Sequence, residues 1–363
     1  MNEIGFKKSE LDTPALWVDL TILEQNIRHL SDFFKSAGVN WRPHTKGIKT
    51  PAIAHKAIAA GAIGVTCAKL GEAEVMAAAG ITDILIANEV VGSQKITRLV
   101  NLRRHADVKV AVDDPENARA IGQAAQAKGV EVGILVDVDT GMGRTGVQPG
   151  EAAVDLSMLV HQTPGLRYQG VMAWEGHAAG MSDREAKQRT IEEAVGALDR
   201  TAQMCRQVDL PVEIVSGGGS GTYLTTAHLP GITEIQAGGA IFCDATYLQW
   251  GVDTTPSLFV QARVISRPAP DLAIFDAGFK ALPAWGERNP IPVDLSGFKA
   301  FRTSAEHGSL LLEGPNETLK VGQTVDFIVG YGDQTVFLYD QLYGVRDGVV
   351  ETVWTIQGRG KVR

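Results

Sequence analysis

The chain has 363 residues, of which 44% are hydrophobic and 21% are charged, and its formal net charge is −8. These values are typical of a soluble globular protein that is large enough for one large domain and a smaller one. The negative charge argues against nucleic acid or an anionic membrane as the main partner. The sequence has neither an apolar run of membrane-spanning length nor a secretory leader at its start, so we expect a cytoplasmic protein.

Three scattered cysteines bear on the compartment. Cys67, Cys205 and Cys243 lie far apart in the sequence, and their spacing is not that of a metal site. An odd number of isolated cysteines is typical of reduced thiols in a reducing compartment. We interpret all three as small core residues.

The first part of the chain alternates between two patterns. An extended segment at residues 15–18 precedes a helix that begins after Asp19, and from there β-branched runs alternate with alanine-rich amphipathic stretches. Strands are predicted at residues 63–68, 83–87, 108–112, 131–138, 166–174, 212–216 and 234–237, and helices at 51–60, 72–79, 94–105, 115–128 and 184–207. With the strand that leads to Lys46, this makes eight strand–helix units, the number that closes a parallel (β/α)8 TIM barrel.

After about residue 245 the pattern changes. The segments 257–265, 273–276, 308–313, 324–329 and 336–339 are short and alternating, and Gly, Pro and Asp separate them. They predict strands with no long helix between them. The expected fold class is therefore α/β, with a (β/α)8 TIM barrel over residues 14–250. A β-rich C-terminal domain over residues 251–363, which residues 1–13 join, is expected to follow it.

A lysine marks the end of the first barrel strand. Pro43 keeps the backbone extended and Gly47 loosens it, so Lys46 is predicted to lie on a turn that starts where the strand ends. Enzymes of this fold class keep their chemistry at the carboxyl ends of the strands. Lys46 is therefore the first candidate for a catalytic residue.

Two glycine-rich turns follow the last two predicted strands, one from Ser216 to Thr222 and the other from Ala237 to Ala240. Glycines let backbone N–H groups converge on an anion, and the loops after strands seven and eight of such a barrel form a phosphate site. The spacing is neither that of a P-loop nor that of a dinucleotide-binding turn, and each turn alone could also be a flexible surface loop. The candidate phosphate-binding residues are Ser216, Gly218, Gly219, Ser220, Gly238 and Gly239.

A lysine at one strand end and a phosphate cradle at two others suit pyridoxal 5′-phosphate. Its aldehyde condenses with a lysine amine, its ring needs a flat face, and its phenolic oxygen needs a cation nearby. Arg144 follows the fifth predicted barrel strand and could supply the cation, while His177 follows the sixth and could supply the face. The ordinary alternatives are a salt bridge for Arg144 and a structural role for His177.

Motifs in the same order across nearly the whole chain resemble those of one enzyme family. They are Arg42 to Lys46, Val138 to Gly146, Glu175 to His177, Ser216 to Gly219, Asp276 to Lys280 and Glu306 to Gly308. The resemblance is to the D-threonine aldolase and D-serine dehydratase group of the fold-type III pyridoxal phosphate enzymes, to which alanine racemase is related. It implies a homodimer with active sites at the subunit interface. It also implies Lys46 as the Schiff-base lysine, with Arg144 at the phenolic oxygen, His177 against the ring and the glycine turns around the phosphate.

Departures from the family pattern fall at the expected site. Gly47 and Ile48 stand where the family typically has threonine and histidine, and Trp174 stands beside the cofactor where it usually has tyrosine. Members that use a divalent metal bind it through a histidine and, two residues on, a cysteine or aspartate. Asp333 matches the second ligand, but Tyr331 replaces the histidine, and a phenol is a poor ligand at neutral pH. The resemblance thus leaves open a Mn, Mg or Zn site at Asp333.

The resemblance implies a pyridoxal phosphate-dependent lyase that acts on a D-configured β-hydroxy amino acid. Retro-aldol cleavage like that of D-threonine aldolase is favoured over elimination like that of D-serine dehydratase. Lys46 and His177 would be catalytic, and Tyr331 could act as an acid or base towards the substrate or only pack against its neighbours. The alternatives are a metal-independent amino-acid racemase or epimerase and, in another class, a non-catalytic pyridoxal phosphate-binding carrier.

Overall fold

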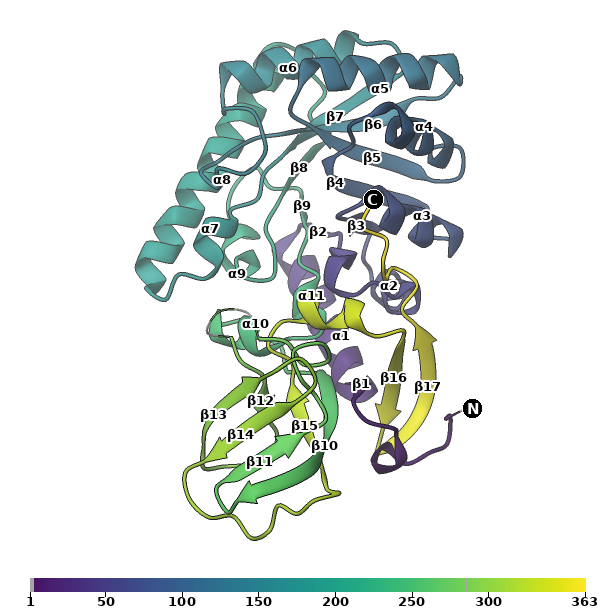
Figure 1. Cartoon of the computed structure of the whole chain (residues 1–363). Helices are drawn as coiled ribbons and strands as arrows, with labels where there is room; N and C mark the ends of the chain where they lie inside the picture. Colours follow the sequence, from purple (N-terminus) through teal and green to yellow (C-terminus); the bar gives the residue numbers. More distant parts are fainter. Residues whose placement is uncertain (1–2, 285, 287) are drawn as a thin grey trace. The chain divides into compact units, whose positions relative to one another are not determined.

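The computed structural model describes residues 3–284, 286 and 288–363, and the chain forms two compact units (Figure 1). One unit consists of the chain up to His29, Gly47–Ala52 and Gly239–Arg359. The other consists of Leu30–Lys46, Ile53–Gly238 and Gly360–Arg363. Residues 1, 2, 285 and 287, which belong to the predicted β-rich domain, lie outside the described residues.

The second of these units is the predicted parallel barrel. Its sheet has the strand order β2-β9-β8-β7-β6-β5-β4-β3, and a parallel bridge between His44 and Thr66 joins the two ends of this order. The TIM-like α/β fold class predicted from the sequence is thus confirmed. The strands are β2 (Asn40–Trp41), β3 (Val65–Cys67), β4 (Asp83–Glu89), β5 (Asp107–Val112), β6 (Val132–Asp137), β7 (Leu166–Met172), β8 (Ile214–Gly217) and β9 (Glu234–Ile235).

Helices follow most of these strands, and side-chain caps fix where several begin. Asp114 accepts a hydrogen bond at the start of α5, and Asp183 does the same for α8. The helix α6 was not singled out in the sequence, and its N-cap is Gly150, which offers no side-chain cap. The helices are α2 (Pro51–Ala59), α3 (Leu70–Ala78), α4 (Ser93–Leu102), α5 (Pro115–Ala127), α6 (Glu151–Gln162), α7 (Gly176–Ala179), α8 (Arg184–Gln207) and α9 (Tyr223–Thr226).

The other unit is β-rich, as predicted. Its main path is β13-β14-β11-β10-β1-β16-β17, with β15 paired to β10 and β12 (Figure 1). The stacked rings of Trp17 and Phe259, 4.6 Å apart, belong to its core. The strands are β1 (Ala15–Asp19), β10 (Leu258–Ala269), β11 (Leu272–Phe275), β12 (Ile291–Pro292), β13 (Phe298–Thr303), β14 (Gly308–Leu312), β15 (Thr324–Ile328), β16 (Gln341–Arg346) and β17 (Val349–Thr355).

Helical segments complete the chain, and one of them corrects the sequence prediction. Residues 336–339, predicted as a strand, form the 3-10 helix η4 (Val336–Leu338), because the preceding α11 (Gly332–Thr335) turns the chain through local hydrogen bonds onto Tyr331. The other segments are α1 (Leu20–Ala37) and α10 (Ala245–Gln249). Among the described residues, no helix combines the length and apolarity needed to cross a membrane.

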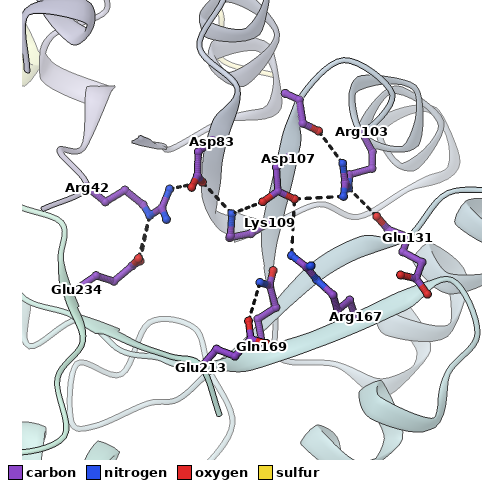
Figure 2. A network of polar contacts seen from close by, with 11 residues as sticks. Arg42, Asp83, Arg103, Asp107, Lys109, Glu131, Arg167, Gln169, Glu213 and Glu234 are labelled. Atoms are coloured by element: carbon purple, nitrogen blue, oxygen red, sulfur yellow. Dashed lines mark hydrogen bonds and ion pairs between the residues drawn. The ribbon is translucent and has the colours of Figure 1, made fainter. Parts of the chain in front are cut away.

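A network of buried and half-buried charges lies where several barrel strands begin (Figure 2). Arg42, which is 1% exposed, directly follows β2, and its Nε lies 3.0 Å from Glu234 Oε2 at the start of β9. Its Nη1 lies 2.6 Å from Asp83 Oδ1 at the start of β4. Lys109 Nζ continues the chain of contacts from Asp83, at 2.8 Å, to Asp107, at 2.9 Å. The network therefore runs across the place where the barrel closes.

Gly64 makes room for this network. A Cβ on Gly64 would lie 2.8 Å from Arg42 Nη1 and 2.3 Å from the carbonyl oxygen of Asp83. A buried charge is tolerated only when its hydrogen-bonding groups are paired, so the guanidinium needs this close approach.

We expect Arg42→Ala to lower the free energy of unfolding by about 3–5 kcal/mol, because it leaves the carboxylate of Glu234 buried without its cation. Chemical denaturation followed by circular dichroism measures this change. The control is Arg189→Ala, which removes an exposed ion pair with Glu185 and should cost less than about 1 kcal/mol. Equal losses in the two variants would contradict a special role for the buried network.

Candidate active site

Lys46 lies beyond the carboxyl end of β2, as predicted. It occupies the 3-10 turn η2 (Thr45–Gly47), and its backbone N–H donates to His44 Nδ1 at 3.3 Å. The buried hydroxyl of Thr45 donates to the carbonyl oxygen of Thr66 at 3.0 Å, which ties the turn to the barrel at β3. The lysine is thus presented from a fixed turn at the carboxyl edge of the parallel sheet.

The second glycine turn passes directly over this segment. A Cβ on Gly238 would lie 2.1 Å from the carbonyl oxygen of His44 and 2.6 Å from its nitrogen. The Trp41 indole donates to the carbonyl oxygen of Ala237 at 2.7 Å, which holds the two segments together. The structure therefore brings one predicted phosphate-binding residue to the backbone that leads to Lys46.

A buried carboxylate holds the first glycine turn, which begins at Ser216 in β8. Glu175, 2% exposed, accepts a hydrogen bond from the Gly218 N–H at 3.3 Å and another from the Thr226 hydroxyl at 2.5 Å. The Gly219 N–H donates to Thr222 Oγ1 at 3.1 Å. Glu175 follows β7, so this contact fixes the turn against the neighbouring strand. The N–H groups of Gly218 and Gly219 are used to shape the turn.

The indole ring of Trp174 occupies the space that two glycines leave. A Cβ on Gly219 would lie 2.3 Å from Trp174 Cη2, and a Cβ on Gly176 would lie 2.2 Å from its Nε1. Trp174 therefore packs against the first glycine turn. Ser216, another predicted phosphate residue, is buried and accepts a hydrogen bond from Gln236 at 2.9 Å.

His177 and Arg144 come from neighbouring strand ends. His177 is exposed on α7, and a Cβ on Gly141 would lie 3.3 Å from its Nε2. Arg144 is exposed on the same loop as Gly141, after β6. Asp139 holds this loop by accepting from the N–H groups of Gly141 and Gly143, both at 3.0 Å. The Gly143 hydrogen bond, with help from the nearby His177, lowers the pKa of Asp139.

Three carboxyl groups that the sequence prediction missed lie behind the Arg144 loop. Glu89, Asp113 and Asp137 end or follow β4, β5 and β6, and an acidic residue at three successive strand ends was the available signal. Burial, reinforced by Asp137, raises the pKa of Glu89 to about 7, and burial also raises the pKa of Asp137. Thr145 donates to Asp137 at 2.8 Å and the Gly146 N–H donates to Asp113 at 3.0 Å, so the group anchors the loop.

Within the β-rich unit, Tyr331 and Asp333 form a hydrogen-bonded pair. The Tyr331 hydroxyl donates to Asp333 Oδ2 at 2.9 Å. Burial and the nearby Asp333 raise the pKa of Tyr331, so the phenol keeps its proton at neutral pH. A Cβ on Gly47 would lie 2.3 Å from Asp333 Oδ1. The carboxylate thus lies against the residue that follows Lys46 in the chain.

The same unit holds this pair in place through Asp244. Asp244 is buried and accepts from the Gly332 N–H at 2.6 Å and from the Tyr247 N–H at 3.0 Å. The ring of Tyr247 lies 6.0 Å from that of Tyr331, and its hydroxyl would lie 2.2 Å from a Cβ on Gly239. Gly239, a predicted phosphate residue, is therefore in close contact with Tyr247, which packs beside Tyr331.

The donor set fits pyridoxal phosphate better than a divalent metal. In the barrel, glycines let the loops beyond β8 and β9 approach their neighbours closely, and Lys46 follows β2. An exposed guanidinium follows β6 and an exposed imidazole follows β7, which are groups that this cofactor needs. Among residues 3–284, 286 and 288–363, no group of three His, Cys, Asp or Glu is arranged to hold a metal ion. The neighbour of Asp333 is a protonated phenol, which is a poor ligand.

Comparison with known proteins gives two successive family matches. Residues 18–246 match the alanine racemase N-terminal domain, and residues 257–345 match a putative serine dehydratase domain. The chain is 35% identical to the 3-hydroxy-D-aspartate aldolase of Paracoccus denitrificans, over 98% of this chain and 94% of that protein. It is also 35% identical to the D-threonine aldolase of an Arthrobacter species, over 98% of this chain and 95% of that protein.

Two solved structures extend this similarity. D-threonine aldolase from Filomicrobium marinum is 36% identical and has a TM-score of 0.95, covering 99% of this chain and 98% of its own. A mutant D-threo-3-hydroxyaspartate dehydratase in the metal-free form is 28% identical, with a TM-score of 0.87 and coverage of 96% and 98%. Aldolases and a dehydratase of D-hydroxy amino acids are thus similar to this chain along nearly its whole length.

The acidic group behind the Arg144 loop predicts a pH-dependent stability. Glu89 has an ordinary pKa of 4.5 when unfolded and about 7 when folded, so the folded state binds more protons between these values. The free energy of unfolding should therefore fall as the pH rises from about 4.5 to about 7, and Glu89→Gln should flatten this dependence. Denaturant titrations across this range measure it. The exposed-residue control Glu193→Gln should keep the wild-type slope, and an unchanged slope in Glu89→Gln would contradict the assignment.

Proposed function

Because the chain belongs to the alanine racemase-like pyridoxal phosphate enzymes, in the group of D-threonine aldolase and D-threo-3-hydroxyaspartate dehydratase, we propose that it cleaves a D-configured β-hydroxy amino acid by retro-aldol reaction. The observation that carries the proposal is the close approach of the Gly238 turn to the backbone that leads to Lys46. This approach is what one cofactor needs in order to contact a lysine at one end and a phosphate cradle at the other.

Each barrel residue has a proposed role towards the cofactor. When bound, pyridoxal phosphate would hold the substrate amine covalently and take up the electron pair left on Cα when a bond to that carbon breaks. Lys46 would carry it, Arg144 would lie near its phenolic oxygen, and His177 would cover a face of its ring. The residues proposed around the rest of the cofactor are Trp174, Ser216, Gly218, Gly219, Ser220, Gly238 and Gly239.

The chain's own groups then move protons. The Lys46 amine, released when the substrate amine takes its place, would return a proton to Cα after cleavage. In an elimination the same amine would instead remove the α-proton. His177 would keep water from the ring face, because its imidazole stands beside the loop that carries Arg144.

Two relatives that match almost the whole chain are aldolases, and this supports cleavage over elimination. Elimination is the second candidate, since a dehydratase structure also matches nearly the whole chain. Racemisation would need a second base on the opposite face of the substrate, and a pure cofactor carrier would not need the β-rich unit. A Mn, Mg or Zn ion at Asp333 is the least supported part, because its phenol neighbour is protonated.

The proposed oligomeric state follows that of the family. We propose a homodimer with active sites at the subunit interface, since the alanine racemase-like enzymes are often dimeric. The three cysteines are all buried thiols, which suits a reducing compartment such as the cytoplasm.

Lys46→Ala should abolish the visible absorbance of the lysine-bound cofactor, because no amine remains at that turn. Absorbance spectroscopy of protein incubated with pyridoxal phosphate, before and after borohydride reduction, measures this. The control is Lys49→Ala, which should keep the band. A borohydride-reducible band that persists in Lys46→Ala and disappears in Lys49→Ala would show that the other lysine carries the cofactor.

The reaction itself can be read from its products. Incubation with D-threonine or 3-hydroxy-D-aspartate should release glycine and an aldehyde in equal amounts, as measured by chromatography and an aldehyde assay. Release of ammonia instead would indicate elimination, and appearance of the epimer inverted at Cα would indicate a racemase or epimerase. If a panel of D-amino acids yields none of these products while the cofactor band is present, the enzyme proposal fails in favour of a carrier.

A further inference from the structure

We infer that Asp333, held by Tyr331 and admitted by Gly47, is the base that takes the proton of the substrate's β-hydroxyl, and that a divalent metal has no part in this step. The inference rests on the proposed function. It assigns this proton transfer to a carboxylate of this chain.

The first support is the space at Gly47. A Cβ there would lie 2.3 Å from Asp333 Oδ1 and 3.4 Å from Asp333 Cγ, distances at which an alanine and this carboxylate cannot coexist unchanged. No strained backbone angle accounts for this glycine, since its φ lies outside the left-handed region. What the glycine provides is room for the carboxylate, one residue after the lysine.

The second support is the hydrogen bond from Tyr331. The phenol donates to Oδ2 at 2.9 Å, which leaves Oδ1 as the oxygen that lies against Gly47. The phenol is 9% exposed and donates its hydroxyl proton to the carboxylate, so this contact orients the carboxylate. The phenol thus holds Oδ2, and Oδ1 lies against Gly47.

The third support is the frame behind the pair. Asp244 fixes the Gly332 N–H at 2.6 Å, and the Thr335 hydroxyl donates to the Tyr331 carbonyl oxygen at 3.0 Å. The short segment from Tyr331 to Thr335 is therefore fixed at both ends. A catalytic base needs such support, because small errors in its position lose much of its effect.

The proton and electrons balance without a metal. The β-hydroxyl proton passes to the Asp333 carboxylate, and the O–H electron pair forms the carbonyl of the released aldehyde. The Cα–Cβ bond breaks and its electron pair stays on Cα, and pyridoxal phosphate held by Lys46 would stabilise that pair. A proton returned to Cα completes glycine, and Asp333 then loses its proton to water.

The test separates cleavage from α-proton chemistry. Asp333→Asn should lower kcat for D-threonine cleavage about 10²-fold or more, the ordinary contribution of a general base. Exchange of the α-proton of glycine in D2O, followed by NMR, should stay within about threefold of wild type, because glycine has no β-hydroxyl. Cleavage unchanged by Asp333→Asn would overturn the inference. Loss of both activities with a normal cofactor band would also overturn it, since Asp333 would then act on more than the hydroxyl.

Gly47→Ala tests the steric part. It should lower cleavage by a factor of about ten or more, because the new Cβ displaces Oδ1, and it should add little in an Asp333→Asn background. The matched control is Gly314→Ala, whose Cβ meets nothing within 4 Å and which should match wild type. Equal losses from Gly47→Ala in both backgrounds would show that the glycine acts independently of Asp333 and would contradict its proposed role.

Metal binding gives a readout that does not depend on turnover. Calorimetric titration with MnCl2 should show no site in the wild-type holoenzyme, whereas Tyr331→His should gain one, because imidazole and carboxylate are then two residues apart. Wild-type cleavage should survive dialysis against a chelator within about twofold. Loss of cleavage that added Mn²⁺ restores would overturn the inference. Absence of cleavage in every preparation, with glycine exchange intact, would instead reject the proposed aldolase function.

Discussion

The position of Lys46 depends on a buried charge, the guanidinium of Arg42. Its strand, β2, has only two residues and therefore few ladder hydrogen bonds of its own. Arg42 binds Glu234 on β9 and Asp83 on β4, so it ties this short strand to both sides of the barrel closure. A buried charge without a partner destabilises the fold. The end of β2 is therefore favourable only where the guanidinium contacts both carboxylates. The turn that carries Lys46 starts from that position.

Glycines around the site serve mainly as space for other groups. Gly219 accommodates the indole ring of Trp174, Gly238 accommodates the backbone of His44, and Gly239 accommodates the ring of Tyr247. A glycine-rich turn is usually read as flexible or as a cradle for an anion. Here the missing side chains also let neighbouring elements approach closely.

The positions of the barrel strands along the chain could be predicted from the sequence. The contacts between residues of distant segments could not. Runs of β-branched residues predicted seven barrel strands, because burial imposes a pattern that local sequence carries. Pro43 and Gly47 predicted that Lys46 follows the end of the eighth. The prediction of a strand at 336–339 was wrong, although Val336, Phe337 and Tyr339 favour strands, because the segment continues a helical turn. The Gln334 N–H and the Thr335 hydroxyl hold that turn by donating to the Tyr331 carbonyl oxygen. The partners of Arg42 and the group around Glu89 come from separate strands, so only the fold could bring them together.

The departures from the family pattern at residues 47, 48 and 331 are physically related. Gly47 leaves the room that the Asp333 carboxylate fills, and Tyr331 supplies the hydrogen bond that the carboxylate accepts. Ile48, which is fully buried, adds an apolar side chain and no polar group that would need a partner. A carboxylate positioned by steric room on one side and by a donor on the other has a defined direction. That is what a base requires when no metal fixes it.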